Sequence, residues 1–182
     1  NVTTSRNGVD TLLIERYGFL GGTMIAGLVN PFMTFHASKE QIVHGIFQEI
    51  IDRLKRLGGY DEETKAFDVE AMKIVLDQMV MEAGVKLLLH TCVIGVVMQG
   101  NVIRGVEIHN KSGKSVVFGK VIVDATGDGD VAVMAGAPYE KGRKEDGLTQ
   151  PMTLNFRMGG VDTGRMPSSQ EINRLFIEAK KR

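Results

Sequence analysis

The sequence has little that would support a disulfide-bonded, membrane-bound or nucleic-acid-binding protein. Cys92 is the only cysteine among 182 residues, so neither an intrachain disulfide nor a dithiol redox centre can form. A lone thiol is typical of a reducing compartment, and we expect a cytoplasmic protein. The 22 Lys and Arg residues balance the 22 Asp and Glu residues, which argues against binding to nucleic acid or to a charged membrane surface.

Long apolar segments and a leader pattern are also missing. The apolar run from Val85 to Leu89 is interrupted by Lys86, and it is far shorter than a segment that crosses a bilayer. The chain starts at Asn1 without a signal-peptide pattern, so we expect a fragment or a processed chain. The four histidines have no metal-ligand spacing, which predicts no metal site.

Glycine, in contrast, is abundant. It accounts for 22 of the 182 residues, well above the usual share of about 7%. With only 4 prolines the composition is not that of a linker. Several glycines stand together in short motifs, which indicates tight turns or backbone that approaches a ligand closely.

Apolar spacing of three and four residues predicts the helices. One helix is expected from Lys39 to Leu57, with Ser38 as its N-cap, and a second from Asp68 to Ala83. The first eight residues resemble the end of a helix. A capping pattern at Ser168 predicts another helix in the tail.

Short apolar runs and alternating patterns predict the strands. Asp10 to Glu15 resembles a buried parallel strand. Further strands are expected at 85–89, 93–98, 102–109, 115–118, 121–124 and 152–158. Tight turns join the strands at 93–98, 102–109 and 115–118, so these three should form an antiparallel meander between two parallel strands. The sequence therefore predicts an α/β fold.

Glu15 is the first candidate for a functional role. An acid at the end of a parallel strand is where nucleotide-binding α/β folds accept hydrogen bonds from the ribose hydroxyls. The glycine fingerprint that normally precedes this acid by about 20 residues would fall before Asn1, so it is absent here. The alternative is an ordinary acid at the end of a strand.

Two glycine-containing segments are further candidates. Ala125-Thr126-Gly127-Asp128 follows the expected strand at 121–124, and its small residues would let backbone pass close to a pyrophosphate or a ribityl chain. Gly21-Gly22-Thr23 would likewise allow a ligand or a second backbone to approach. Taken alone, the first segment could be a strand-to-loop turn and the second a flexible loop.

In this order, the motifs resemble those of the glutathione-reductase-like flavoproteins. More closely, residues 13–32 (LIERYGFLGGTMIAGLVNPF) and 121–139 (VIVDATGDGDVAVMAGAPY) resemble the bacterial FAD-dependent oxidoreductase family. The resemblance covers roughly residues 1–162. It implies a three-layer FAD/NAD(P)-binding domain with a parallel sheet, helices on one face and an inserted antiparallel meander on the other. Residues 1–150 would form a partial FAD-binding domain without its first strand, and 151–182 would begin a substrate domain.

The resemblance also implies roles at the adenosine end of the cofactor. Glu15 would bind the adenosine ribose, and Arg16 would flank the adenine. Val93 would present its backbone to the adenine ring, although a plain sheet residue is the alternative for that position.

At the other end of the cofactor, Gly21, Gly22 and Thr23 would lie along the flavin. Ala125 would leave room for the cofactor, and Thr126, Gly127 and Asp128 would run beside the pyrophosphate and ribityl chain. The disulfide-reductase members of the superfamily carry two cysteines where this sequence has Met24 and Val29, so thiol–disulfide exchange at that pair is excluded.

The functional hypothesis is an FAD-dependent oxidoreductase that acts on a small-molecule substrate, with no general acid or base identified. One alternative is a catalytically silent scaffold or interaction fragment that retains no flavin and self-associates through exposed sheet edges. Another is a nicotinamide-dependent dehydrogenase. The inserted meander favours FAD, because simple dehydrogenase domains use a helical crossover at that point.

Overall fold

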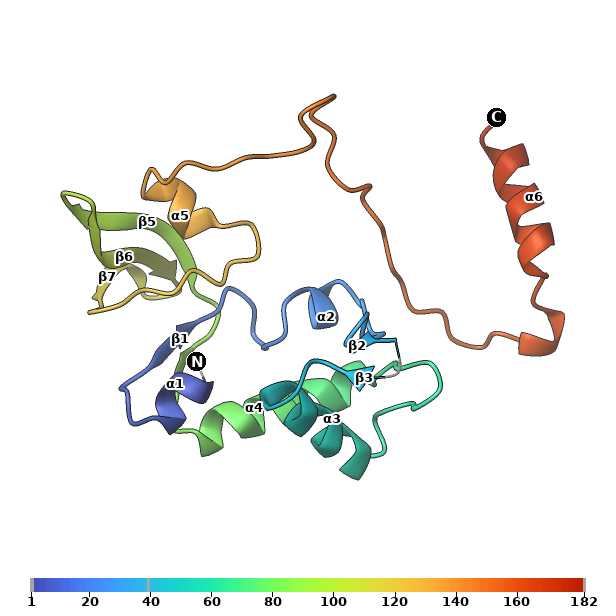
Figure 1. Ribbon diagram of the computed structural model, residues 1–182, viewed down its shortest axis with the longest axis horizontal. Coiled ribbons are helices and arrows are strands. Elements are labelled where there is room, and N and C mark those ends of the chain that lie inside the picture. Colours follow the sequence, from blue (N-terminus) through green and yellow to red (C-terminus); the bar gives the residue numbers. More distant parts are fainter. Residues whose placement is uncertain (1, 39, 182) are drawn as a thin grey trace.

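The computed structural model describes residues 2–38 and 40–181 (Figure 1). The helices α3 and α4 form one side, the meander β5–β7 lies on the opposite side, and β1 runs between them. The helices are α1 (Val2–Arg6), α2 (Thr23–Ala26), α3 (Ile46–Arg56), α4 (Val69–Glu82), α5 (Asp130–Met134), a 3₁₀ turn (Thr163–Arg165) and α6 (Ser169–Ala179). The strands are β1 (Leu12–Ile14), β2 (His36–Ala37), β3 (Glu40–Gln41), β4 (Lys86–Leu88), β5 (Cys92–Gln99), β6 (Val102–Asn110) and β7 (Gly113–Phe118).

The strands β1 and β4 form a parallel pair, as their apolar runs predict. Leu12 lies opposite Lys86, and Ile14 lies opposite Leu88. The ladder continues past β1, because the Glu15 amide donates to the Leu88 carbonyl at 2.9 Å. The chain leaves the pair at Glu15, which therefore occupies the carboxyl end of a parallel strand.

The predicted meander is confirmed. The strands β5, β6 and β7 pair antiparallel in that order, and positive φ occurs at Gly100 in the first turn and at Gly113, the first residue of β7. Val106 and Ile108 of β6 are buried together with Val131 of α5, and Ile14 packs against this cluster. The meander, α5 and the end of β1 thus share one small core. The α/β class with parallel strands, helices and an inserted meander is the fold that the sequence predicted.

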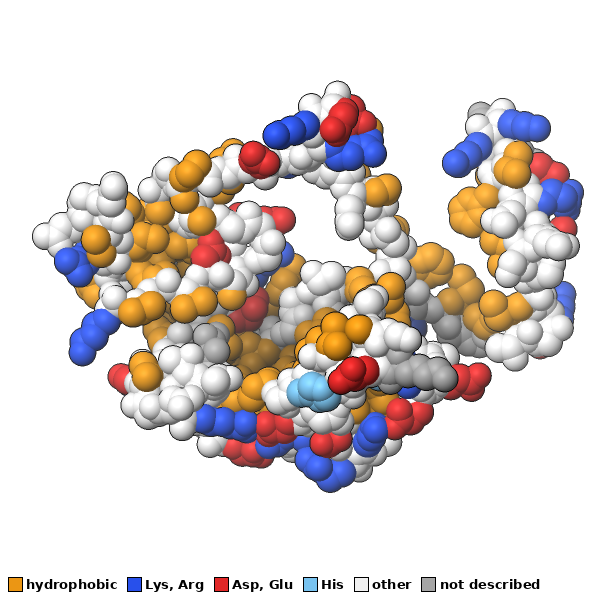
Figure 2. Space-filling view, viewed as in Figure 1, with side chains coloured by type: hydrophobic (Ala, Val, Ile, Leu, Met, Phe, Trp, Pro, Cys, Tyr) orange, Lys and Arg blue, Asp and Glu red, His pale blue; other side chains and the backbone are white. Residues whose placement is uncertain are grey.

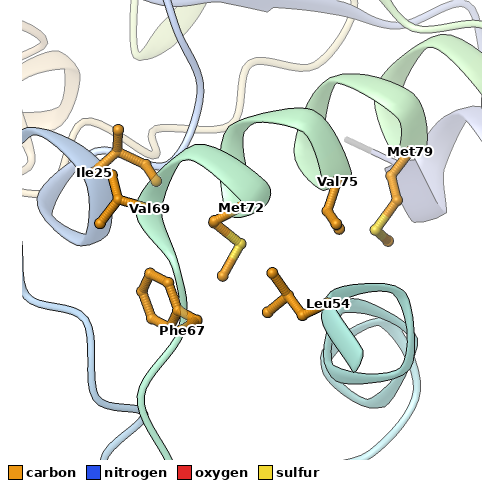
Figure 3. Packing of buried hydrophobic residues seen from close by; sticks show 7 residues of the cluster. All are labelled: Ile25, Leu54, Phe67, Val69, Met72, Val75 and Met79. Carbon is orange, nitrogen blue, oxygen red and sulfur yellow. The ribbon is translucent and has the colours of Figure 1, made fainter. Parts of the chain in front are cut away.

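The largest core lies between α3 and α4. Asp68 caps α4, accepting a hydrogen bond from the Ala71 amide at 2.8 Å, and α4 then follows its predicted period. Met72, Val75 and Met79 of α4 are almost completely buried and lie on the side that faces Leu54 of α3 (Figure 3). This packing fixes the position of the helical side of the molecule.

The helix predicted from Lys39 to Leu57 is shorter than expected. It begins at Ile46, and its N-cap is Gly45 rather than Ser38. Ser38 instead has φ 55° in the turn of the β2–β3 hairpin, while Lys39 lies outside the described residues. Backbone pairing of His36 with Gln41 outweighs the helical period, since the residues just after β3 are exposed and gain no burial from a helix.

Two predicted strands are wrong. In the described part of the chain, residues 121–124 and 152–158 pair with no strand. Val121 and Val123 are 83% and 74% exposed, and Met152 is fully exposed. An apolar run becomes a strand only where another backbone satisfies its amides and carbonyls, and neither run has such a neighbour here. The tail helix is confirmed, since the Ser168 hydroxyl accepts from the Glu171 amide at the start of α6.

An ion-pair network joins α1, α3 and α4 on the outer side of the helical layer, where Figure 2 shows acidic and basic side chains interspersed. Arg6 donates two hydrogen bonds to Glu49, at 2.6 and 2.8 Å. Arg53 donates both to Glu49, at 2.7 Å, and to Glu82, at 2.5 Å. The hydrogen bonds from Arg6, and then those from Arg53, outweigh partial burial and lower the pKa of Glu49 to about 2.

The low pKa of Glu49 makes part of the stability pH-dependent. The unfolded pKa of a glutamate is about 4.3, so the contribution is complete above that pH and disappears as the pH falls towards 2. Glu49→Gln should lower the free energy of unfolding at pH 7 by about 1 kcal/mol. Urea unfolding at several pH values checks this, and the gap to the unsubstituted chain should close near pH 2. Asp77→Asn on the exposed face of α4 is the control, and a gap independent of pH would contradict the prediction.

None of the described helices combines the length and the apolar character that a membrane span requires.

Candidate functional site

Glu15 is held by three backbone hydrogen bonds at the end of β1. Its amide donates to Leu88, its carbonyl accepts from the Thr91 amide at 3.0 Å, and its Oε1 accepts from the Tyr17 amide at 2.8 Å. Within the described residues no hydrogen bond reaches Oε2. The carboxylate is thus fixed in place with one oxygen still able to accept from a hydroxyl group.

A flat aromatic surface follows Glu15. The Tyr17 and Phe19 rings are stacked, with centroids 5.2 Å apart and an interplanar angle of 2°. The exposed Arg16 guanidinium lies 4.8 Å from the Tyr17 ring centroid, and its Nη2 donates to the Tyr17 hydroxyl at 3.0 Å. Arg16 therefore projects a planar cation beside Glu15, which suits stacking against a base. The sequence analysis did not single out Tyr17, although a backbone amide two residues after an acid is a typical donor to that acid's carboxylate.

Gly21, Gly22 and Thr23 lie at the start of α2. Gly21 has φ 107°, and a Cβ there would stand 2.5 Å from Ile25 Cγ1. Gly22 has φ 49° and open space where a Cβ would project. At Gly21 only glycine satisfies both the positive φ and the close packing. At Gly22 the missing side chain leaves the backbone accessible.

Val93 lies near the start of β5, an edge strand of the meander sheet. It pairs with Ile108, and the register then shifts between Val93 and Gly95. Val93 also packs against the small core that receives Ile14, the neighbour of Glu15. The adenosine-end candidates Glu15 and Val93 are therefore connected through shared packing, which the sequence alone did not show.

Asp124 organises the loop that contains the remaining candidates. Its Oδ1 accepts from the Thr126 amide at 3.0 Å and from the Thr126 hydroxyl at 2.8 Å, while its Oδ2 accepts from the Ala132 amide at 2.9 Å. Burial alone would raise the pKa of Asp124, but these hydrogen bonds outweigh it and lower the pKa. The Thr126 hydroxyl in turn accepts from the Asp130 amide at 2.8 Å. The side chains of Asp124 and Thr126 thus tie the loop to the first turn of α5.

The tied loop leaves its glycine backbone exposed. Ala125, Gly127 and Asp128 are all exposed, and Gly127 has φ 89° with nothing within 4 Å of the position of a Cβ. Asp124 was part of the motif but was not predicted as a functional residue. Its signal is a threonine two residues after an aspartate, a pattern typical of a side chain that caps a turn.

Asp124→Ala should loosen this loop. It removes three hydrogen bonds, so the amides of residues 126–132 should exchange their hydrogens about tenfold or more faster. Hydrogen exchange followed by mass spectrometry measures the effect. Asp128→Ala, at an exposed carboxylate in the same loop, is the matched control. Equal protection in both variants would show that Asp124 does not hold the loop.

The candidates fall into two groups in space. Val93 packs in the core of the meander, together with Ile14, which precedes Glu15, and Ile122, which precedes the Asp124 loop. Gly21 instead lies against Leu76 of α4. No cluster of three or more His, Cys, Asp or Glu side chains suited to a metal ion occurs among the described residues. The arrangement offers a carboxylate acceptor, a planar cation and two stretches of accessible glycine backbone.

A comparison with known protein families identifies the family of this chain. The pattern of the family described as FAD dependent oxidoreductase matches residues 1–181. The chain belongs to this family. FAD is therefore the cofactor that the candidate residues have to fit. They do fit it: Glu15 has a free acceptor oxygen for a ribose, and Gly22 and Gly127 are open where a side chain would obstruct a cofactor.

Several solved structures are similar to parts of this chain. THI4 of Thermovibrio ammonificans has a TM-score of 0.50 and 21% identity, over 73% of this chain and 54% of that chain. The myxobacterial chondrochloren halogenase CndH, a variant of FAD-dependent halogenases, has a TM-score of 0.44 and 20% identity, over 68% and 33%. L-proline dehydrogenase from P. horikoshii has a TM-score of 0.33 and 27% identity, over 39% and 18%.

The chain spans about half the length of THI4 and a third or less of the other two structures. The similarity to THI4, at 21% identity, shows a shared fold but not a shared activity. No curated protein matches the sequence.

Proposed function

We propose that the chain forms the cofactor-binding part of an FAD-dependent oxidoreductase that acts on a small-molecule substrate. The observation that carries this proposal is the family match over residues 1–181. When bound, the flavin supplies hydride or electron transfer between the substrate and an acceptor. The protein's contribution is to bind and orient the cofactor and to set the charges around it.

In the proposed binding mode, Glu15 accepts hydrogen bonds from the adenosine ribose, and Arg16 flanks the adenine. The free Oε2 of Glu15 and the stacked Tyr17 beside Arg16 support these roles. Val93 contributes its backbone near the adenine. Its packing into the core below Glu15 supports that position.

Gly21, Gly22 and Thr23 are proposed to lie along the flavin, with the accessible backbone of Gly22 as support. Ala125, Thr126, Gly127 and Asp128 are proposed to run beside the pyrophosphate and ribityl chain. The hydrogen bonds of Asp124 hold this loop in one conformation before any cofactor arrives, which lowers the entropic cost of binding.

Visible absorption of the purified chain, before and after incubation with FAD, tests the proposal. Flavin bands that co-migrate with the protein on gel filtration are the expected result. A colourless protein that also fails to retain added FAD would overturn the proposal for this chain and would favour a catalytically silent fragment. Incubation with NAD in place of FAD distinguishes the nicotinamide-dependent alternative, which predicts retention of that cofactor instead.

One observation favours self-association as an accompanying property. Within the described residues β1 pairs only with β4, so the other edge of β1 carries no ladder, and nearby Val9 is 53% exposed. An uncovered edge is a template for a strand from a second copy. Gel filtration with light scattering measures this property, and a monomer at all concentrations would contradict it.

The cellular location and the domain division are also part of the proposal. The lone Cys92 supports a cytoplasmic location. The change from packed elements before Gly136 to an exposed, extended chain after Pro138 supports a substrate domain that begins near residue 151.

A further inference from the structure

A cleft of about 360 Å³ lies next to the proposed flavin residues. One wall consists of Leu28, Asn30 and Val69, and the other of residues 154–157. Its volume is at the lower end of the range found for small-molecule sites. Figure 1 shows the extended chain after α5 descending to the side of the molecule where α2 and β2 lie. Residues 154–157 of this segment line the second wall.

The first wall belongs to the main core. Val69 is 2% exposed, and the Phe67 amide donates to the Asn30 carbonyl at 3.0 Å. Leu28 has φ 53°, a conformation that costs a non-glycine residue energy and is concentrated at functional sites. This wall is therefore set by the helical core before any ligand binds.

The second wall brings a cation to the cleft. The Asn155 side-chain amide donates to the Gly27 carbonyl at 3.2 Å, which joins this segment to the loop after α2. Arg157 lines the cleft and forms no ion pair with the charged groups of the described residues. Leu154 and Phe156 supply apolar surface beside it. The cleft thus combines one unpaired positive charge, two side-chain amides and apolar walls.

We propose that this cleft binds a small organic carboxylate, with Arg157 pairing with the carboxylate and the apolar walls holding the rest of the molecule. A guanidinium matches a carboxylate with two parallel hydrogen bonds, and one cation balances one negative charge. The inference rests on the proposed function in one respect. Thr23 is the first of the four residues of α2, which span about 6 Å, and the Val29 amide beside the cleft wall donates to the Thr23 carbonyl at 3.4 Å, so a bound carboxylate would lie beside the proposed flavin residues.

Titration of the ¹⁵N-labelled chain with benzoate tests the inference by NMR. Benzoate should cause saturable shifts at Asn30 and residues 154–157, whereas benzamide, which has the same shape without the charge, should bind about tenfold or more weakly. Arg157→Gln should weaken benzoate binding by a similar factor. Arg165→Gln is the control, because Arg165 is an exposed arginine in the 3₁₀ turn outside the cleft.

Equal binding of benzoate to the Arg157→Gln variant and the unsubstituted chain would overturn the inference. So would shifts that map outside the cleft, or tighter binding of inorganic phosphate than of benzoate. FAD retention is measured separately by absorbance on the same samples. If the chain retains FAD but does not bind benzoate, the carboxylate site is overturned and the proposed function stands. If benzoate binds through Arg157 but FAD is not retained, the carboxylate site is supported and the flavin proposal is overturned.

Discussion

Leu54→Ala is expected to lower the free energy of unfolding by about 2–5 kcal/mol. Leu54 is completely buried, and its side chain points from α3 towards Met72 and Val75 of α4 (Figure 3). The alanine removes apolar surface and leaves a cavity that the two packed helices cannot close. Because domains of this size are stable by only about 5–15 kcal/mol, this is a large fraction of the total.

Urea unfolding followed by circular dichroism measures the effect of the Leu54 substitution. Leu57→Ala is the matched control, since Leu57 is the C-cap residue of the same helix and is 49% exposed. Its effect should stay within about 0.5 kcal/mol. A similar loss in both variants would show that the α3–α4 interface is not the main core.

Glu15→Gln is expected to weaken FAD binding by about tenfold or more. The Tyr17 amide already occupies Oε1, and an amide nitrogen in place of Oε2 cannot accept from a ribose hydroxyl. A hydrogen bond to a charged group contributes about 1.5–3 kcal/mol, which sets the size of the loss. Quenching of flavin fluorescence on titration of FAD with protein gives the dissociation constants.

The control for Glu15 is Glu63→Gln, at an exposed carboxylate in the loop between α3 and α4. Its FAD affinity should match that of the unsubstituted chain. Unfolding curves of both variants show whether the fold is intact. A folded Glu15→Gln variant with unchanged affinity would mean that Glu15 is only an acid at the end of a strand, the alternative that its position alone leaves open.

Local patterns predicted the elements whose neighbours are close in sequence. Asp68 and the apolar period that follows it define α4, and glycine turns define the meander. The period failed before Ile46, because the backbone of Phe35 accepts from the Ile42 amide and the chain is held in a hairpin instead. Helix propensity predicts structure poorly where such tertiary hydrogen bonds compete with the helix.

The strands expected at 121–124 and 152–158 failed for a different reason. Their apolar residues follow strand periodicity, but a strand also needs a paired backbone, and that pairing is not encoded in the segment itself. A sequence pattern reports what a side chain would prefer to bury. It does not report whether a neighbour is present to bury it.

The candidate site likewise contains residues that local motifs predict and residues that they do not. Glu15 and the Gly127 loop could be proposed from motifs, because acids and glycines at strand ends have a direct chemical meaning. The hydrogen bonds of Asp124 and the cleft beside Arg157 could not. Asn155 and Gly27, which hold the cleft together, are 128 positions apart in the sequence, and no local pattern links them.

The register of β1 with β4 has a consequence for the order of folding. Leu12 and Lys86 are more than about 70 residues apart, and closing so long a loop costs roughly 4 kcal/mol of chain entropy. The helices α3 and α4 lie within this loop and are joined by residues 57–68, a connection far shorter than the loop between β1 and β4, so they can associate first. Their association shortens the effective distance between the two strands. We therefore expect the helical core to form before the parallel pair that positions Glu15.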